Sequence, residues 1–511
     1  MVSAHPNLRR RFINTNGIIS VGKSHLLPDL LSKHPEDYID INTHKVMERV
    51  KPWVEIPSPI ARETFGIMGS VIPPAIQERW ERQRRYGFTH DFTSLQPIVV
   101  DKILVLLVDF DDKPAQVPIE IIYQRLFGDY VNSFKEYYKE VSYGRYVPHG
   151  EIHGWYRAPN FSTYYTNKEN GFGKYPNSAE KLVEDVVDMA SNDLDIDWTS
   201  FDNNDNGYID NLIVIHSGAE AAWTGDVNDF WAHVWIIPEP KMIQGRYVWI
   251  YAMTSEYLGK PTDPQVIGGD VHEHGHQLGL PDLYDYTDQS NGVGAYSLMG
   301  AGSWGNIGQT PTHLDPWSKY VLGFTDPIID PIGTVYIDNA EQNSTNIIYT
   351  TADPKEYFIA ENRQKILYDT YLPSEGLLIW RINENQIDNR MYNDDKSCYL
   401  AGLVQADNLN DLENRANNGD LGDPYPGIMN NRSFGRFTNP SSMLCNGQTQ
   451  DFLINNVSDS ANTMSFESLI PGPLQPSPVQ EGVVQAGLSP AQAIILTGLA
   501  AGTVYAATRK P

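Results

Sequence analysis

Three histidines and a glutamate lie within five positions of one stretch, residues 268–285 (GGDVHEHGHQLGLPDLYD). Residues four apart on a helix share a face, so His272 and His276 can direct their imidazoles at one cation. Glu273 lies beside them, where it can take a proton from water at the metal. His274 is turned about 200° away from His272 on the same helix. The pattern H-E-x-x-H therefore predicts a metal site that performs hydrolysis.

The residues that follow this helix predict a third ligand. Gly279 can end the helix in a left-handed conformation, and Pro281 prevents the helix from resuming. The chain then turns back, so that Asp282 can supply a carboxylate oxygen. Two neutral imidazoles, one carboxylate and one open position describe catalytic zinc, whereas structural zinc usually has four protein ligands. A solvated helix face with satisfied histidines is the alternative interpretation.

A methionine turn follows the motif, with Met299 in the sequence SLMG. A methionine in this place supplies an apolar floor beneath a zinc site and holds its ligands in position. A lone methionine is more often a filler of the core. Its position shortly after H-E-x-x-H-x-x-G-x-x-D favours the functional interpretation.

The motif with its methionine turn resembles the metzincin clan of zinc peptidases. The segments HEHGHQLGLPDLYD, GAYSLMGAGSWG and PTHLDPWSKYVLGF resemble the M6 family, the immune inhibitor A-type metallopeptidases, and the likeness covers roughly residues 102–467. The resemblance implies zinc at His272, His276 and Asp282, with Glu273 as the general base. It implies a secreted zinc metalloendopeptidase, a hydrolase that cleaves the peptide bonds of protein substrates with metal-activated water.

Two features depart from the pattern of these families. Some metzincins place a tyrosine two residues after the methionine as an oxyanion or ligand group, whereas this chain has Ala301. Tyr296 and His313 are the remaining candidates for stabilising an oxyanion. Family members are normally secreted, yet the basic N-terminus lacks a continuous apolar region, so no standard signal peptide is visible.

A second cation site is expected in FDNNDNGYIDN, residues 201–211. Its oxygen-bearing residues match positions 1, 3, 5, 7 and 9 of a calcium loop, and Gly207 allows the sharp turn. The terminal glutamate of an EF-hand is missing, because Ile213 stands there, and an Asx-rich turn without an ion is the alternative. A weaker acidic loop is NNGDLGD, residues 417–423. The expected calcium ligands are Asp202, Asn204, Asn206, Tyr208 through its carbonyl, and Asp210.

The rest of the chain must position these residues, and its 511 residues are too many for one ordinary domain. Residues 1–98 form a leader, and residues 99–325, where helices and strands alternate, form the catalytic domain. Short strands with turns fill residues 326–470, and residues 471–511 are a Pro-rich linker with an apolar tail. The predicted fold class is α+β: a metzincin-like zinc peptidase domain, with a mixed sheet and an active-site helix, followed by an all-β, sandwich-like domain.

Five segments of the catalytic part have clear secondary-structure patterns. The apolar run at residues 101–112 predicts a buried strand, and residues 208–218 and 245–253 are also strand-like. Residues 124–142 and 178–192 are amphipathic and predict helices.

Composition limits the partners of the chain. A formal net charge of −26, from 64 acidic and 38 basic residues, argues against a nucleic-acid binder, which shows a basic face. The uncharged stretch at residues 483–508 contains Pro490 and Gln492 and makes a poor membrane span, so membrane contact is not expected. Cys398 and Cys445, the only cysteines, form either one disulfide or two buried thiols.

The leader suggests a means of control. Its position before the catalytic domain and its basic ERQRR, residues 81–85, make it a candidate inhibitory pro-segment, with a structural extension as the alternative. The rival function is a non-catalytic adhesin or carbohydrate-binding protein on a degenerate peptidase scaffold. Intact Glu273 argues against this rival, because a decayed site usually loses its base first.

Overall fold

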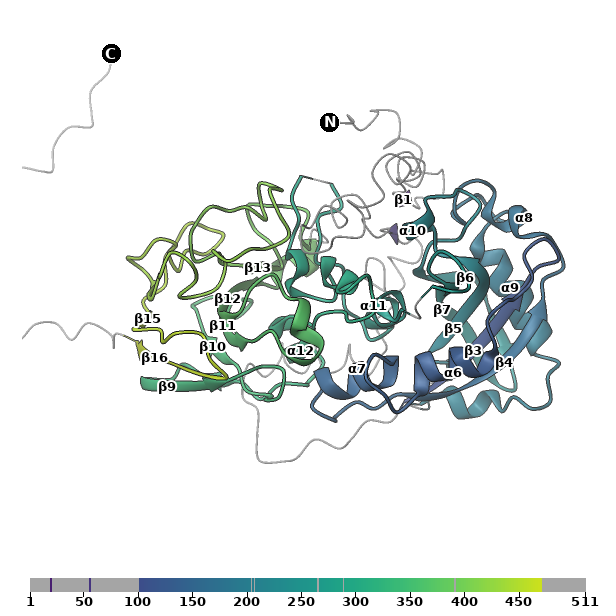
Figure 1. Ribbon diagram of the computed structural model, residues 1–511, viewed down its shortest axis with the longest axis horizontal. Helices are drawn as coiled ribbons and strands as arrows, with labels where there is room; N and C mark the ends of the chain where they lie inside the picture. The colour runs from purple at the N-terminus through teal and green to yellow at the C-terminus, as the bar shows by residue number, and fades with distance from the viewer. Residues whose placement is uncertain are drawn as a thin grey trace, which may run out of the picture. The chain divides into compact units, whose positions relative to one another are not determined.

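Figure 1 shows a computed structural model of the chain. It describes residues 101–470 except 204, 206, 264–265, 288 and 390–391, and the two short strands β1 (Ile19–Ser20) and β2 (Glu55–Ile56), which pair antiparallel. The predictions for the remaining residues of the leader and for residues 471–511 lie outside the described residues.

The first part of the described chain is built on a five-stranded sheet in the order β4-β3-β5-β7-β6. Strand β3 is parallel to both β4 and β5, β5 is parallel to β7, and β6 is antiparallel at the edge. This mixed sheet with few helices agrees with the predicted α+β peptidase domain. Its strands are β3 (Lys102–Asp109), β4 (His149–Arg157), β5 (Leu212–Ala219), β6 (His233–Ile243) and β7 (Arg246–Tyr257).

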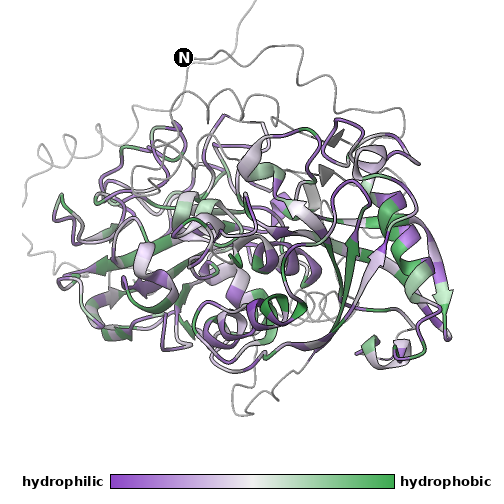
Figure 2. Ribbon diagram, turned by 45° about the vertical axis from the view of Figure 1, so that its right-hand side comes forward, coloured by the Kyte–Doolittle hydropathy of each residue, from purple (hydrophilic) through white to green (hydrophobic). Residues whose placement is uncertain are grey.

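Strand β3 is apolar from Ile103 to Val108 because both faces of the sheet are covered. Ile103 and Val105 belong to one hydrophobic cluster, while Leu104 and Leu106 belong to another on the opposite face. Helix α9 (Ala179–Ala190) packs into the second cluster. The first cluster receives α6 (Ile119–Phe127), α7 (Phe134–Val141) and α11 (Gly268–Gln277). In Figure 2 hydrophobic residues gather on strands and helices, whereas most loops are hydrophilic.

The helix expected at residues 124–142 is two helices, α6 and α7. Gly128 ends α6 in an extended conformation, and the hydroxyl of Ser133 caps α7 by accepting a hydrogen bond from the backbone N–H of Glu136 at 3.2 Å. The other short helices are α8 (Ser162–Thr166), η3 (Trp198–Phe201), α10 (Ala221–Thr224), η4 (Gly294–Tyr296), η5 (Ala301–Trp304) and α12 (Pro316–Val321).

The chain after α12 forms two further sheets. A five-stranded sheet has the order β13-β12-β11-β10-β8, and a four-stranded sheet has the order β14-β15-β16-β9. Phe358 and Ala360 of β11 belong to a cluster shared by both sheets, whereas Tyr357 and Ile359 belong to the cluster that also covers one face of the first sheet. The sheet that contains β11 therefore packs into two hydrophobic clusters, one on each of its faces. The elements are β8 (Ile328–Ile329), β9 (Gly333–Asp338), β10 (Ile347–Tyr349), β11 (Glu356–Arg363), η6 (Leu367–Tyr371), β12 (Gly376–Asn383), α13 (Asn385–Asn389), β13 (Ala401–Leu403), β14 (Phe434–Gly435), β15 (Leu453–Asn455) and β16 (Thr463–Leu469).

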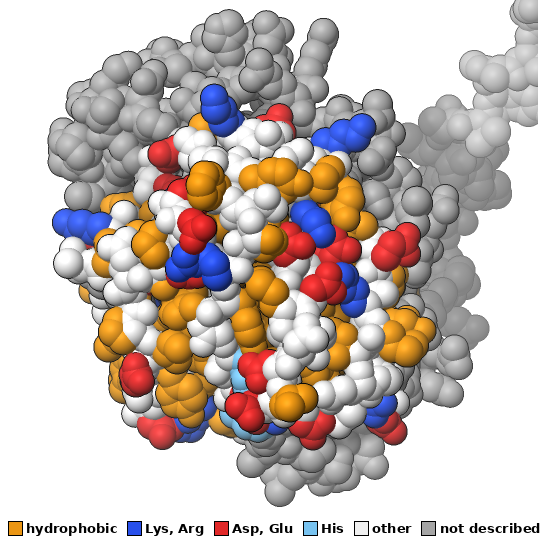
Figure 3. All heavy atoms as spheres, turned by 90° about the vertical axis from the view of Figure 1, so that its right-hand side faces the viewer, with side chains coloured by type: hydrophobic (Ala, Val, Ile, Leu, Met, Phe, Trp, Pro, Cys, Tyr) orange, Lys and Arg blue, Asp and Glu red, His pale blue; other side chains and the backbone are white. Residues whose placement is uncertain are grey.

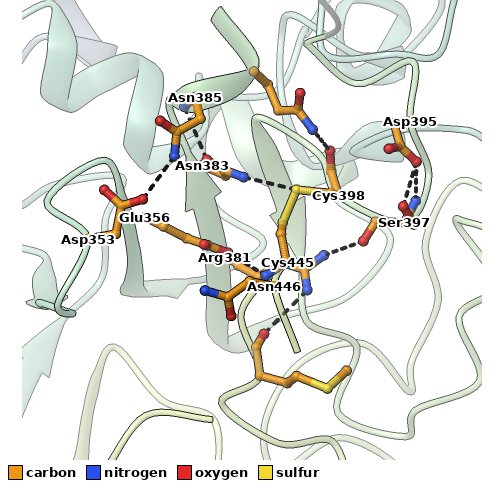
Figure 4. Close-up of a disulfide and its surroundings, with 12 residues drawn as sticks. Asp353, Glu356, Arg381, Asn383, Asn385, Asp395, Ser397, Cys398, Cys445 and Asn446 are labelled. Carbon is orange, nitrogen blue, oxygen red and sulfur yellow. Dashed lines mark hydrogen bonds between the residues drawn. A yellow bond between two sulfur atoms is a disulfide. The ribbon is translucent and has the colours of Figure 1, made fainter. Parts of the chain in front are cut away.

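Cys398 and Cys445 form a disulfide, with Cα atoms 5.4 Å apart (Figure 4). Asn383 donates a hydrogen bond to the sulfur of Cys398 at 3.0 Å, and the backbone N–H of Cys445 donates to Glu356 at 2.6 Å. Of the two alternatives that the sequence left open, the disulfide is therefore the one the structure contains.

Residues 101–470 belong to one compact unit, so the boundary at residue 325 stays a prediction. Within the part of the chain that the structure describes, none of the helices has the length and apolar character needed to span a membrane. The face over α8, α9 and β4 carries acidic and basic side chains among hydrophobic ones (Figure 3).

Candidate metal centre

Helix α11 positions both histidines of the motif. Their rings project from one face of the helix, with centroids 4.8 Å apart. His272 Nδ1 lies 2.9 Å from the carbonyl oxygen of Leu298, and His276 Nδ1 lies 2.8 Å from that of Leu280. Because a carbonyl oxygen only accepts, Nδ1 of each ring is the donor. Nε2 of each ring therefore carries a lone pair and can bind a metal.

The start of α11 is held close to a neighbouring loop. A Cβ at Gly268 would lie 2.1 Å from the backbone oxygen of Ser303, a contact that no side chain tolerates. A Cβ at Gly269 would meet only the Cβ of Ala232, at 3.9 Å. Gly268 thus permits the close approach, whereas Gly269 faces open space.

The end of α11 turns the chain back as the sequence predicts. Gly279 adopts φ 98°, and the N–H of Leu280 donates to the carbonyl of Gly275 at 3.0 Å. This long hydrogen bond around a left-handed glycine is the Schellman ending of a helix. It directs the following residues under the helix, toward the two Nε2 atoms.

Asp282 follows this turn and lies close to both imidazoles. Its Oδ1 is 3.1 Å from His272 Nε2 and 3.3 Å from His276 Nε2. These three residues, called the metal group below, are buried, and their potential ligand atoms all lie within 4.8 Å of one another. Oδ1 is buried and has no well-formed hydrogen bond. Two imidazole nitrogens and an unsatisfied carboxylate oxygen fit a divalent ion such as zinc.

Charge interactions link Asp282 to the two histidines. Burial opposes the charge of Asp282, but His276 and His272 outweigh this effect and hold the pKa of Asp282 below its ordinary value. Burial also opposes the charge of His276, whose pKa is nevertheless raised by Asp282. A cation bound among these atoms would take the place of protons, because metal ligands must be deprotonated.

Two tyrosines close the site on the side of Asp282. The hydroxyl of Tyr286 donates a hydrogen bond of 2.9 Å to Asp282 Oδ2, the oxygen that does not face the histidines. Tyr284 is buried, and Asp282 is the main charged group that raises its pKa after burial itself. The hydrogen bond from Tyr286 fixes the carboxylate so that Oδ1 points at the two rings.

Met299 lies directly beneath the helix. A Cβ at Gly275 would lie 2.7 Å from the sulfur of Met299, so the missing side chain leaves room for the methionine. Met299 is fully buried, and its carbonyl accepts a hydrogen bond from the N–H of Leu283 at 2.8 Å. The preceding residue, Leu298, is the one that holds His272. The methionine turn therefore contacts both the helix and the returning chain.

Glu273 is next to the metal group and is buried. Burial raises its pKa to about 8, and Asp282, Glu220 and Asp270 add to this effect while His272 opposes it. Together with His272, Glu273 lines a cavity.

The other histidine of the motif and the candidate oxyanion groups point elsewhere. His274 Nε2 lies 2.7 Å from the hydroxyl of Tyr146, away from the metal group, as the helical spacing predicts. The hydroxyl of Tyr296 donates to Asp423 at 3.0 Å. His313 lies between Glu140 and Lys319. Both candidates are thus engaged in contacts outside the metal group.

The expected calcium loop is described only in part, because residues 204 and 206 lie outside the described residues. Asp202 accepts a hydrogen bond from the N–H of Gly207 at 2.9 Å and pairs with Arg246. Asp210 accepts a hydrogen bond from the N–H of Asn203 at 2.6 Å. These are the contacts of a tight polar turn. Calcium at this loop stays a prediction.

The weaker acidic loop contains similar turns. The side chain of Asn417 accepts from the N–H of Gly419 at 2.9 Å, and Asp423 accepts from the N–H of Asp420 at 2.6 Å. Burial raises the pKa of Asp423 to about 8, with Asp420 and Asp407 contributing. Calcium at this second loop also stays a prediction.

Comparison with known proteins places this site in a family. Residues 95–324 match the family model described as the immune inhibitor A peptidase M6 catalytic domain. The Immune inhibitor A of Bacillus thuringiensis subsp. alesti is 33% identical over 272 residues, which are 43% of this chain and 39% of that protein. The Pre-pro-metalloprotease PrtV of Vibrio cholerae serotype O1 (strain M66-2) is 31% identical over 274 residues, which are 43% of this chain and 29% of that protein. The match covers less than half of either relative.

The matched segment contains the whole metal group, together with Glu273 and Met299. Two buried histidines and a glutamate on one helix, with an aspartate just beyond its end, have the composition expected of a metallopeptidase site. The M6 peptidase family that the sequence resemblance indicates is therefore confirmed for residues 95–324.

Two parts of the site were missed by sequence reasoning. Tyr286 follows Asp282 by four residues in DLYDYTD, and this repeated aromatic pattern was a signal that the segment packs against the ligand. Arg125, which lines the cavity beside Glu273, gave no signal, because it comes from a helix far from the motif in sequence.

Proposed function

We propose that the chain is a zinc-dependent endopeptidase that hydrolyses peptide bonds in protein substrates. The observation that carries this proposal is the buried convergence of His272, His276 and Asp282 beside Glu273. Membership of the M6 family and the metalloprotease name of one relative support it. The rival function, a non-catalytic adhesin on a degenerate scaffold, is not favoured, because the ligand set and the base are both intact.

The chain's own residues divide the work of hydrolysis. His272 Nε2, His276 Nε2 and Asp282 Oδ1 would hold the zinc ion, which when bound supplies Lewis acidity and lowers the pKa of water. Glu273 accepts a proton from the attacking water and then donates it to the nitrogen of the leaving amine. Leu298 and Leu280 fix the ring orientation through their carbonyl oxygens.

The test of this proposal is Glu273→Gln, which removes the base and leaves the three ligands in place. The variant should retain about one zinc per chain and lose most of its hydrolysis of casein, because general-base catalysis typically contributes ~10²- to 10⁴-fold. Zinc content is measured by mass spectrometry and hydrolysis by release of labelled peptides. The matched control is Glu180→Gln on α9, across the sheet, which should cleave casein like the wild type.

The contradictory outcomes are specific. A purified wild-type chain that holds no transition metal, or that cleaves casein equally well after a chelator, would contradict the zinc assignment. A Glu273→Gln variant with near-wild-type turnover would contradict the role of the base.

We also propose the finer parts of the architecture and context. A metzincin organisation is supported by Met299 beneath the helix, and a β-sandwich-like second domain is supported by the cluster shared by the two C-terminal sheets. Secretion is supported by the family resemblance and by the disulfide, since disulfides persist in oxidising compartments. An inhibitory role for residues 1–98 is supported by their position before the matched segment. Calcium at residues 201–211 is supported by the loop sequence.

A further inference from the structure

A cavity opens beside Glu273 and His272 and has two kinds of lining. Along its walls the side chains are aromatic or aliphatic. Besides Glu273, the lining contains one guanidinium and two further carboxylates. A substrate side chain that enters the cavity would meet both apolar walls and charged groups. The walls include Trp231, Leu258, Val266, Trp304 and Ile307, and the charged residues are Arg125, Glu220 and Asp270.

The guanidinium of Arg125, which lines the cavity, can donate a further hydrogen bond. It is only 2% exposed, and its Nη1 donates to the carbonyls of Ser255 and Glu256, each at 3.1 Å. Its Nε is 3.2 Å from Asp270 Oδ2, which neutralises the charge. Nη2 is buried and has no hydrogen-bond partner among the described residues. An oxygen acceptor brought by a ligand would satisfy this donor.

Glu220 supplies the complementary group. It is 8% exposed, and its Oε1 accepts hydrogen bonds from the N–H groups of Ala222 at 3.3 Å and Ala232 at 3.1 Å. A carboxylate has about four acceptor sites, so Glu220 can accept a further hydrogen bond from a donor in the cavity. The lining of the cavity thus contains a buried donor without a partner, on Arg125, and a carboxylate with remaining acceptor capacity, on Glu220.

We propose that this cavity receives the substrate side chain on one side of the scissile bond and that Arg125 and Glu220 select glutamine there. This inference rests on the proposed peptidase function. A primary amide accepts from Arg125 through its oxygen and donates to Glu220 through its nitrogen.

Lysine, glutamate and methionine match Arg125 and Glu220 less well than glutamine does. Lysine would bring an ammonium group to Arg125, and glutamate would bring a second carboxylate to Glu220. Methionine has nearly the length of glutamine but gives no acceptor to Nη2 of Arg125 and no donor to Glu220. A site that is built to hydrogen-bond a substrate group discriminates strongly against an analogue that lacks it.

The experiment begins with wild-type digestion of a complex peptide library and mapping of the cut sites by mass spectrometry. Glutamine should be enriched at one of the two positions that flank the cut. Four peptides that differ only at this position, with Gln, Met, Glu or Lys, are then compared by kcat/KM. The glutamine peptide should exceed the methionine peptide by at least about tenfold, the effect of one hydrogen bond to a charged group.

Three variants assign the preference to the named residues. Glu220→Gln should raise kcat/KM for the glutamate peptide relative to the glutamine peptide, because it removes the repelling charge. Arg125→Lys keeps the positive charge beside Asp270 and should bring the ratio of glutamine to methionine close to one. Gly269→Val adds a side chain where a Cβ meets only Ala232. It should lower kcat/KM for the glutamine peptide more than for a fifth peptide that carries alanine at this position.

A purely structural role for Arg125 would lower kcat/KM equally for all four peptides, and that result overturns the inference. So does a library in which lysine or methionine equals glutamine, or a Glu220→Gln variant with an unchanged ratio. These outcomes leave the proposed function standing, because cleavage itself is retained. A chain that cleaves none of the peptides contradicts the proposed function and this inference with it.

Discussion

The hydrogen bond from Tyr286 to Asp282 gives the sharpest test of how the metal group is held. Replacing Tyr286 by phenylalanine removes only the hydroxyl that donates to Asp282 Oδ2 at 2.9 Å. The three ligand atoms, and the carbonyls that orient both histidine rings, stay in place. The carboxylate is then free to rotate, so that Oδ1 spends less time aimed at the two Nε2 atoms.

The size of the effect can be bounded in two ways. Removing a partner that orients a metal ligand typically weakens metal binding ~10- to 100-fold. This range corresponds to about 1.4–2.8 kcal/mol, since each 1.4 kcal/mol is tenfold. A hydrogen bond to a charged group contributes ~1.5–3 kcal/mol, which agrees. We therefore expect the zinc Kd of Tyr286→Phe to rise by one to two orders of magnitude.

The assay is competition for zinc between the protein and a fluorescent chelator, with unfolding of the metal-free protein followed in parallel. Tyr156→Phe is the matched control, because Tyr156 also donates to a carboxylate, that of Asp193 at 2.8 Å, but lies on β4. The control should leave the zinc Kd unchanged. A zinc Kd of Tyr286→Phe within twofold of the wild type, with the metal-free fold intact, would refute the reasoning.

Three further predictions concern stability and are measured by urea unfolding. Gly268→Ala should lower the free energy of unfolding by ~1–3 kcal/mol through its backbone clash, whereas Gly269→Ala should stay within about 0.5 kcal/mol; equal effects would contradict the contrast. Replacing Cys398 and Cys445 by serine should cost roughly 4 kcal/mol, because the disulfide closes a loop of 47 residues, and an unchanged midpoint would argue against this bond. Burial lowers the pKa of His233 to about 4 from 6.5, so the unfolded state binds more protons between these pH values and stability falls as pH falls through them. In His233→Gln, the free energy of unfolding should change over this pH range by less than in the wild type, the difference being on the order of 3 kcal/mol. An unchanged pH dependence of the free energy of unfolding would contradict a neutral buried histidine.

The metal group could be predicted because its geometry is local. His272 and His276 share a face through helical spacing alone, and Gly279 and Pro281 require the chain to turn. Asp282 then has little choice of position, since only five residues separate it from His276. Each step depends on backbone conformations that individual residue types impose. No contact between distant parts of the chain was needed.

Contacts that depend on distant segments were not predictable in the same way. The expected helix at residues 124–142 breaks at Gly128, because this glycine takes an extended conformation that the apolar periodicity does not reveal. Strand β6 was missed because Pro238 and Pro240 interrupt its pattern, and prolines are tolerated there only because β6 is an edge strand with an irregular register. Sequence patterns do not state which strand lies at an edge.

The residues proposed for the chemistry of the site are close in sequence, whereas those proposed for its selectivity come from distant segments. The ligands, the base and Met299 lie between residues 272 and 299, whereas the cavity beside them takes Arg125 from α6 and Glu220 from the residue after β5. Arg125 donates hydrogen bonds to two carbonyls of β7 and pairs with Asp270 of α11. Because Arg125→Lys keeps the charge beside Asp270, it should alter which peptide bonds are cut while the affinity for zinc stays the same. The two properties are carried by different segments, because a metal site needs fixed angles over a short distance and a side-chain cavity needs walls from several elements.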